Sequence, residues 1–355
     1  MIITKGELLT ALVFIKETKM NQYQDYTAYQ NYATPITLPQ KPPKARLHTG
    51  IIAFAVVLVI LLTSVAQVVL QVVVELTNPA LMENDWYVWA LSSLPMYLFG
   101  MPLAYLLLLT IPKSAPQKQK LNPLMWIGFL FLCFALSFAT NSLGQYVNDW
   151  IYNMLGVEVE NAVGEMTSVT PFGINLLFVG ILAPVFEELF YRKAVIDRLR
   201  RYGDLPAILI SGLIFGLIHG NFSQVFYATA VGMLLSFIYV RTGSVLYTIS
   251  IHAAFNMIGG VYTTELVRRM GENLTPAEGD TVGQVMLLAY SVFTVLSLIV
   301  GTIFLLANLG RFRRSLKKGE YTLSFDKWMN ALVFNPGMWV FVAMIALLFL
   351  SSLFV

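Results

Sequence analysis

The sequence predicts an all-α membrane protein, built as a polytopic bundle of about eight or nine transmembrane helices. Three observations lead to this fold class: the composition, the length of the apolar stretches and the placement of Lys and Arg. Hydrophobic residues make up 57% of the 355 residues, charged residues only 12%, and the mean hydropathy is +0.68. Soluble domains carry about 25% charged residues. We therefore expect most of the surface of this chain to face lipid.

The apolar stretches have the length that a membrane span requires. A helix needs about 20 apolar residues to cross a hydrocarbon core of about 30 Å. We expect spans at 50–74, 86–111, 122–143, 173–196, 205–220, 222–240, 244–262, 282–308 and 337–355. The fifth is short and the ninth ends with the sequence, so the prediction is eight or nine spans.

The placement of Lys and Arg predicts the orientation in the cell membrane. Except for Arg268 and Arg269, all 23 Lys and Arg residues lie in five segments on one side: 1–48, 112–121, 192–204, 241–243 and 309–336. The opposite loops at 75–85 and 144–172 hold none. Because basic residues favour the cytoplasmic side, we expect a cytoplasmic N-terminus and an active-site opening on the cytoplasmic side. The net charge of +3 is too small to indicate a nucleic-acid partner.

A few polar residues fall inside the expected spans, where ionisable groups are costly and mark function. They are Glu187, Glu188 and Arg192 in the fourth span, His219 in the fifth, and His252 and Asn256 in the seventh. Counted from the inner flanks at 1.5 Å per residue, Glu187 and His252 lie roughly 16 Å deep and His219 roughly 22 Å. Three helices therefore bring polar groups to a similar level.

Helical spacing separates the roles of the two glutamates. Glu188 and Arg192 are four residues apart and can form an ion pair on one face. Glu187 points about 100° away, and we expect it to be free to act as a base. Pro184, one turn earlier, removes a backbone hydrogen bond and can bend the helix. His252 and Asn256 share a face of their helix.

Small residues line two of the neighbouring spans. Gly212, Gly216 and Gly220 recur every four residues in the fifth span, and Ala228, Gly232 and Ser236 do so in the sixth. Such faces let membrane helices approach closely. We therefore expect these two spans to pack tightly beside the polar residues. By contrast, Pro95, Tyr97 and Pro102 in the second span are interpreted as kink and packing residues.

The three motifs resemble those of the CPBP family, which comprises the CAAX-protease (Rce1-like) and bacteriocin-processing (Abi) membrane peptidases. The resemblance rests on Glu-Glu-xxx-Arg at 187–192, Phe-xxx-His at 215–219 and His-xxx-Asn at 252–256, in this order on successive spans. It implies an Rce1-like core and an intramembrane endopeptidase acting on membrane-associated proteins or peptides. By the same resemblance, Glu187 is the catalytic glutamate, supported by Glu188 and Arg192, and His219, His252 and Asn256 complete the site.

The resemblance also divides the chain. We expect a cytoplasmic tail with an interfacial helix at 1–48, flanking transmembrane helices at 49–172, and a catalytic core at 173–262. Residues 263–355 then hold the C-terminal transmembrane helices and a basic cytoplasmic loop, 309–336. Within the terminal parts, 5–16 and 328–334 are expected to lie at the membrane surface.

Two mechanisms fit these residues. In the first, Glu187 takes a proton from a water molecule that attacks the peptide carbonyl, while His219, His252 and Asn256 hold the water and stabilise the oxyanion. In the second, His219 and His252 bind Zn²⁺ together with a glutamate. The spacing differs from the HExxH motif of soluble zinc proteases, and the metal-independent mechanism is preferred.

Two functions of other classes remain open at this stage. Buried Glu and His residues can form the proton relay of a proton-coupled transporter, although the two halves of the chain lack the matching broken helices that a carrier requires. The chain can also be a non-catalytic immunity or scaffold protein that keeps the family fold. In that case Glu188 and Arg192 serve only as an ion pair between helices.

Overall fold

The computed structural model describes residues 44–156, 170–271, 274 and 280–353, and within these residues the regular structure is entirely helical. The interfacial helix expected at 5–16 lies outside the described residues. Among these described residues, seven helices are long and apolar enough to cross a membrane, and an eighth span is formed if one bent pair of helices is counted. The chain is thus a multi-pass helical membrane protein, as predicted.

The first three spans precede the polar motifs. Helix α2 covers Ala45–Thr77, and a short 3₁₀ turn, η1, follows at Pro79–Glu83. The second span, Asp85–Leu108, is continuous and consists of α3 (Asp85–Pro95), the π-helical segment η2 (Met96–Gly100) and α4 (Met101–Leu108). The third is α5 (Pro123–Leu155). The amide oxygen of Asn122 caps α5 by accepting the N–H of Leu124.

The fourth span, Phe172–Tyr202, carries the first motif. It runs through α7 (Phe172–Asn175), η3 (Leu176–Leu182), α8 (Ala183–Glu187), η4 (Glu188–Ile196), α9 (Asp197–Leu199) and η5 (Arg200–Tyr202). Both η3 and η4 are π-helical. Segments of this kind occur frequently at functional sites.

The remaining helices follow in order. They are α10 (Asp204–Leu217), α11 (Phe222–Thr242), α12 (Val245–Asn256), η6 (Met257–Tyr262), α13 (Thr263–Met270), α14 (Thr281–Ser315), α15 (Phe325–Leu332) and α16 (Pro336–Ser351). Segments α12, η6 and α13 form one span, Val245–Met270.

The prediction of a span at 205–220 was wrong. Helix α10 has 14 residues, so it is about 21 Å long at 1.5 Å per residue, whereas the hydrocarbon core is about 30 Å thick. The helix ends because Gly220 turns the chain in the left-handed region, with φ of +69°. His219 therefore lies on the turn after α10, and the count of spans falls from eight or nine to seven or eight.

The last predicted span is bent where it meets 328–334, the segment expected at the membrane surface. Helices α15 and α16 are inclined by 58° across their short break. Asn335, buried in this break, donates to the carbonyl oxygens of Arg46 (2.8 Å) and Ala331 (2.9 Å), and its own side-chain oxygen accepts the N–H of Gly337 (3.0 Å). One amide side chain thus joins α15, α16 and the start of α2.

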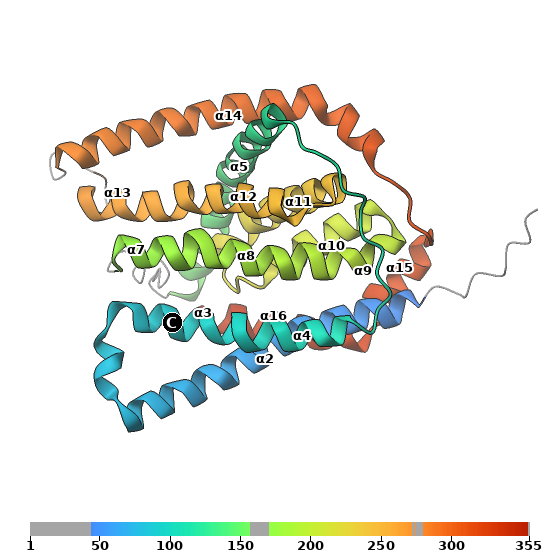
Figure 1. The fold of residues 1–355 in the computed structure, drawn as a ribbon, viewed down its shortest axis with the longest axis horizontal. Coiled ribbons are helices and arrows are strands. Elements are labelled where there is room, and N and C mark those ends of the chain that lie inside the picture. Colours follow the sequence, from blue (N-terminus) through green and yellow to red (C-terminus); the bar gives the residue numbers. More distant parts are fainter. Residues whose placement is uncertain (1–43, 157–169, 272–273, 275–279, 354–355) are drawn as a thin grey trace, which may run out of the picture. The chain divides into compact units, whose positions relative to one another are not determined.

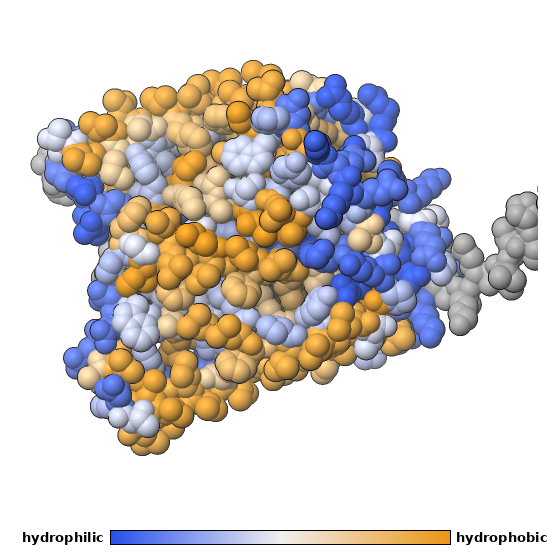
Figure 2. Space-filling view, viewed as in Figure 1, coloured by the Kyte–Doolittle hydropathy of each residue, from blue (hydrophilic) through white to orange (hydrophobic). Residues whose placement is uncertain are grey.

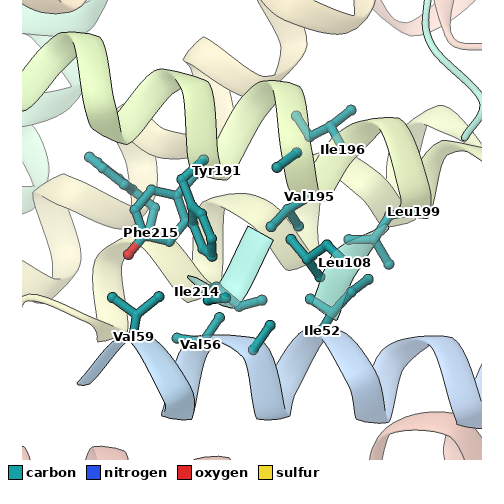
Figure 3. Close-up of a cluster of buried hydrophobic side chains, with 14 of the residues drawn as sticks. Ile52, Val56, Val59, Leu108, Tyr191, Val195, Ile196, Leu199, Ile214 and Phe215 are labelled. Atoms are coloured by element: carbon teal, nitrogen blue, oxygen red, sulfur yellow. The ribbon is translucent and has the colours of Figure 1, made fainter. Parts of the chain in front are cut away.

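The core brings α2, α4, the fourth span and α10 together (Figures 1 and 3). Ile52 and Val56 of α2 and Leu108 of α4 pack against the buried side chains of Val195 and Leu199. This apolar cluster fixes the C-terminal half of the helix that carries the glutamates.

Close packing of α10 on α11 follows the predicted small-residue faces. A Cβ added at Gly216 would overlap Thr229, and one added at Gly232 would lie 2.8 Å from the ring of Phe215. Gly220 does not pack against α11 as predicted. It contacts Leu348 of α16 and allows the turn after α10. The tight α10–α11 contact holds Phe215 and His219 beside the fourth span.

Candidate active site

The buried ion pair predicted between Glu188 and Arg192 is present. Arg192 Nε lies 3.1 Å from Glu188 Oε2, and both side chains are fully buried, at 0% exposure. A lone charge in this apolar interior would be strongly unfavourable, and the opposite charge of its partner offsets much of that cost. The guanidinium also lies over the ring of Phe215, 4.4 Å from its centre, where a cation–π contact adds stabilisation.

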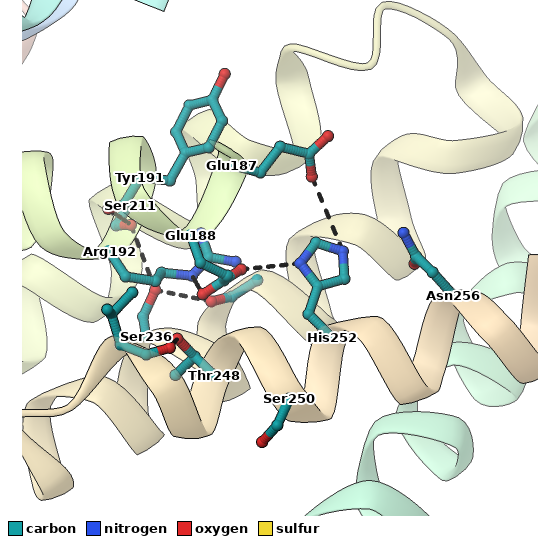
Figure 4. Close-up of polar contacts among 12 residues, drawn as sticks. Glu187, Glu188, Tyr191, Arg192, Ser211, Ser236, Thr248, Ser250, His252 and Asn256 are labelled. Carbon is teal, nitrogen blue, oxygen red and sulfur yellow. Dashed lines mark hydrogen bonds and ion pairs between the residues drawn. The ribbon is translucent and has the colours of Figure 1, made fainter. Parts of the chain in front are cut away.

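His252 lies between the two glutamates (Figure 4). Its Nδ1 is 3.0 Å from Glu188 Oε1, and its Nε2 is 3.8 Å from Glu187 Oε2. Because Arg192 keeps Glu188 ionised, Glu188 accepts and Nδ1–H donates. The Nε2 of a neutral His252 then faces Glu187 as an acceptor. The two glutamates thus contact opposite nitrogens of one ring, a shared partner that helical spacing alone did not predict.

His219 reaches the same region from the turn after α10. Its Nδ1 lies 2.7 Å from the carbonyl oxygen of Phe215. A carbonyl oxygen can only accept, so Nδ1 carries the proton and Nε2 of the neutral ring is an acceptor. This contact fixes the tautomer of His219.

Phe215 connects the polar side chains. Its ring lies edge-on to His219, with 5.1 Å between centroids, and to His252, with 5.7 Å. The ring is 3% exposed. Together with its contact to Arg192, this packing places groups from the fourth span, α10 and α12 around one aromatic side chain.

Asn256, one turn after His252, points toward the fourth span. Its Nδ2 donates to the carbonyl oxygen of Val179, at 2.9 Å. A side-chain amide has two N–H groups, so one remains for another acceptor. The predicted side chains from three segments are thus gathered here. Glu187 keeps 17% of its side-chain surface exposed, whereas Glu188 keeps none.

Three tyrosines near Glu187 were not predicted as site residues. Tyr97, Tyr191 and Tyr227 all lie within electrostatic range of its carboxylate. Tyr97, interpreted from sequence as a packing residue, stacks on Phe186 with 4.6 Å between centroids. Tyr191 follows Glu187 by four residues, and that spacing was the sequence signal that could have identified it.

The side chains around Glu187 include residue types that can bind a metal ion. Among the side chains that the structure describes, no group of three or more His, Cys, Asp or Glu is arranged to hold a metal. His252 Nδ1 is taken by Glu188 and His219 Nδ1 by a backbone carbonyl. Both rings are thus held through Nδ1, which leaves Nε2 of each to bind either a water molecule or a metal ion.

Fold and site together define a class: a multi-pass helical membrane protein with a buried Glu–His–Arg cluster and one accessible carboxylate. Residues 170–258 match the family model described as type II CAAX prenyl endopeptidase Rce1-like. The resemblance to the CAAX-protease family, drawn from the three motifs, is thereby confirmed. In general terms, this match supports a CAAX-type membrane protease.

A curated relative agrees with the family match. The chain is 26% identical over 193 residues to a Bacillus subtilis (strain 168) protein named "Putative membrane peptidase YdiL". The alignment covers 52% of this chain and 77% of the relative. No solved structure matches the chain.

Proposed function

We propose that this protein is an intramembrane endopeptidase in which Glu187 activates water. One observation carries the proposal: Glu187 is the exposed member of the glutamate pair, and it faces Nε2 of His252, whose other nitrogen is held by the buried Glu188–Arg192 pair. A carboxylate beside a fixed imidazole is suited to general-base catalysis. The Rce1-like match supports the same class of reaction.

The proposed reaction begins with a water molecule between Glu187 and the imidazoles. Glu187 takes one proton from this water, and the oxygen attacks the carbonyl carbon of the peptide bond. Nε2 of His219 accepts the second O–H of the water and orients it, because its tautomer is fixed by Phe215. When the tetrahedral intermediate collapses, protonated Glu187 gives its proton to the leaving amine, which completes the proton balance.

Negative charge develops on the carbonyl oxygen during this attack. The second N–H of Asn256 is available to donate to that oxygen, since the first is held by Val179. Preorganised donors of this kind stabilise an oxyanion strongly in a site shielded from water. We therefore assign Asn256 to the oxyanion side, and His252 to positioning Glu187 through Nε2.

The test uses two fluorogenic peptides in lipid vesicles, one carrying a prenylated cysteine near its C-terminus and one without the prenyl chain. Wild-type protein should cleave at least one of them. Glu187→Gln and His219→Ala should each lower the rate by about 10²- to 10⁴-fold, because each removes a group that handles the proton or the water. Glu83→Gln, an outer-side carboxylate far from the site in sequence, is the matched control.

The outcomes separate the alternatives. Unchanged cleavage in both Glu187→Gln and His219→Ala would contradict the proposal. Proton flux into vesicles that depends on Glu187, without cleavage, would favour a transporter. The same preparations should be analysed for zinc: wild-type turnover without bound metal supports the glutamate mechanism, whereas zinc in stoichiometric amount would favour the metal mechanism.

We further propose that the N-terminal end of α2 and the opening of the site lie on the cytoplasmic side. The distribution of Lys and Arg supports this orientation. Hydrophilic residues gather at the end of the bundle where α9 and α15 lie, and the lipid-facing flank is mostly apolar (Figure 2). Arg200 and Arg201 are at this end of the fourth span.

A further inference from the structure

The helix that carries the glutamates presents two parallel pairs of side chains. Glu188 and Arg192 point into the core, where they meet His252. Glu187 and Tyr191, also four residues apart, project together on the other side in Figure 4. Tyr191 therefore lies beside the carboxylate assigned to the chemistry, although no motif contains it.

The ring of Tyr191 is fixed, but its hydroxyl is not engaged. The ring lies edge-on to Phe190 (5.2 Å between centroids) and to Phe215 (5.5 Å), and the residue is 1% exposed. Its backbone oxygen accepts from Ser211 at 2.9 Å, whereas the hydroxyl has no hydrogen-bond partner among the residues that the structure describes. The hydroxyl oxygen is not completely shielded, although the residue as a whole is almost fully buried.

A phenolic hydroxyl without a partner in an apolar interior is unfavourable. Transferring a hydroxyl out of water without a hydrogen bond costs about 1–3 kcal/mol in proteins, and a phenylalanine would pack equally well between Phe190 and Phe215. A rigid ring that holds an unpaired O–H beside Glu187 is therefore suited to a ligand that brings its own acceptor.

We propose that Tyr191 is a substrate-binding residue of this site, and that its O–H donates to a backbone carbonyl of the bound peptide next to the bond that is cut. This inference rests on the peptidase function proposed above. A peptide carbonyl oxygen needs a hydrogen-bond donor. Ionised Glu187 and Nε2 of neutral His219 both accept hydrogen bonds, so they cannot bind this oxygen. Asn256 supplies one free donor, and Tyr191 supplies a second on the Glu187 side.

Tyr191→Phe tests the role because it removes only the hydroxyl. A hydrogen bond made equally in the ground state and the transition state affects KM rather than kcat. We expect KM for the cleaved peptide to rise about threefold to tenfold, kcat to stay within about twofold, and thermal stability to rise, because an unpaired buried hydroxyl is removed. An unchanged KM would overturn the proposal.

Tyr202→Phe is the matched control, since its hydroxyl has a structural partner. Tyr202 Oη lies 2.6 Å from Nδ1 of His48. Losing this hydroxyl should lower stability and leave KM unchanged. The opposite pattern for Tyr191 would distinguish substrate binding from a structural role.

A binding measurement separates this proposal from the function on which it rests. The prenylated peptide is titrated against Glu187→Gln protein and against the double variant Glu187→Gln/Tyr191→Phe. We expect the double variant to bind about threefold to tenfold more weakly. Equal affinity rejects the role of Tyr191. Binding by Glu187→Gln without any cleavage by the wild type rejects the peptidase function alone, and absence of both binding and cleavage rejects both.

Discussion

At the scale of single residues, the buried Glu188–Arg192 pair determines how His252 is presented. Because Glu188 is held ionised, His252 must direct its Nδ1–H toward it and turn Nε2 to Glu187. A fixed tautomer is the condition for any role of this imidazole in catalysis. The Glu188–Arg192 pair therefore serves to orient His252 more than to stabilise the fold.

Removing one member of this pair should destabilise the protein. Arg192→Met leaves Glu188 charged and unpaired at 0% exposure, so we expect a loss of about 3–5 kcal/mol. Thermal unfolding in detergent measures it. Arg311→Met, which removes an exposed arginine on α14, is the control and should change little. Equal stability of the two variants would show that Glu188 is not held as an ion.

Replacing Phe215 is expected to lower both the stability of the protein and its cleavage activity. Phe215→Ala removes a buried ring that touches His219, His252 and Arg192, and a deletion of this size costs about 3–5 kcal/mol. Phe215→Leu keeps most of the volume and should lose less stability while still lowering activity, since the edge contacts with both imidazoles disappear. Full activity in Phe215→Leu, measured with the vesicle assay, would contradict the connecting role.

The sequence predicted these residues because intramembrane ionisable groups are rare. Glu187, Glu188, Arg192, His219, His252 and Asn256 were all predicted as site residues; the structure brings them together, and their catalytic roles stay predictions. The carbonyl contacts of His219 and Asn256 could not be predicted, because backbone acceptors leave no pattern in the sequence. Tyr191 was missed for a related reason: a tyrosine in a span resembles an ordinary packing residue until its neighbours are known.

At the scale of elements, the contact between α10 and α11 sets the distance between the motifs. Gly216→Ala should be destabilising, since its Cβ would overlap Thr229 and lie 2.7 Å from the backbone oxygen of Val225. We expect a loss of about 1–3 kcal/mol and reduced activity, because His219 follows on the same chain. Gly173→Ala in α7 is the matched control.

The control differs from the test only in its surroundings. A Cβ added at Gly173 meets nothing within 4 Å, so the change should be neutral or slightly stabilising because alanine favours the helix. Thermal unfolding of both variants checks the prediction. Similar melting temperatures would mean that α10 and α11 tolerate a wider separation.

The misassigned fifth span shows what hydropathy cannot resolve. The stretch 205–220 is as apolar as a true span, but the helix stops at Leu217. Asp204 Oδ1 accepts from Arg200 Nε at 2.9 Å and Asp204 Oδ2 from the backbone N–H of Lys317 at 2.8 Å. Because α10 is only about 21 Å long and is anchored at one end, His219 lies on the turn that follows it, beside the other site residues.

At the scale of the whole molecule, the arrangement of spans follows from composition, while their exact number depends on local breaks. The bend between α15 and α16 and the short α10 account for the difference between the predicted eight or nine spans and the seven or eight observed. Both breaks depend on tertiary contacts, such as those of Asn335 with α2. Length and hydropathy carry no information about them.

The proposed orientation gives a direct prediction. In a Cys133→Ser background, Lys118→Cys should be protected from a membrane-impermeant thiol reagent in intact cells, and Glu83→Cys should be labelled. The two positions lie at opposite ends of the second span, Asp85–Leu108. Labelling of Lys118→Cys with protection of Glu83→Cys would reverse the assigned topology.

The central claim is that Glu187 is the base that activates water, and its most direct test compares chemistry with binding in one protein. Single-turnover cleavage of the prenylated peptide in vesicles is measured for wild type and Glu187→Gln, together with peptide affinity. We expect the Glu187→Gln rate to be lower by about 10²- to 10⁴-fold at unchanged affinity. A rate within a few fold of wild type at the same affinity would contradict it.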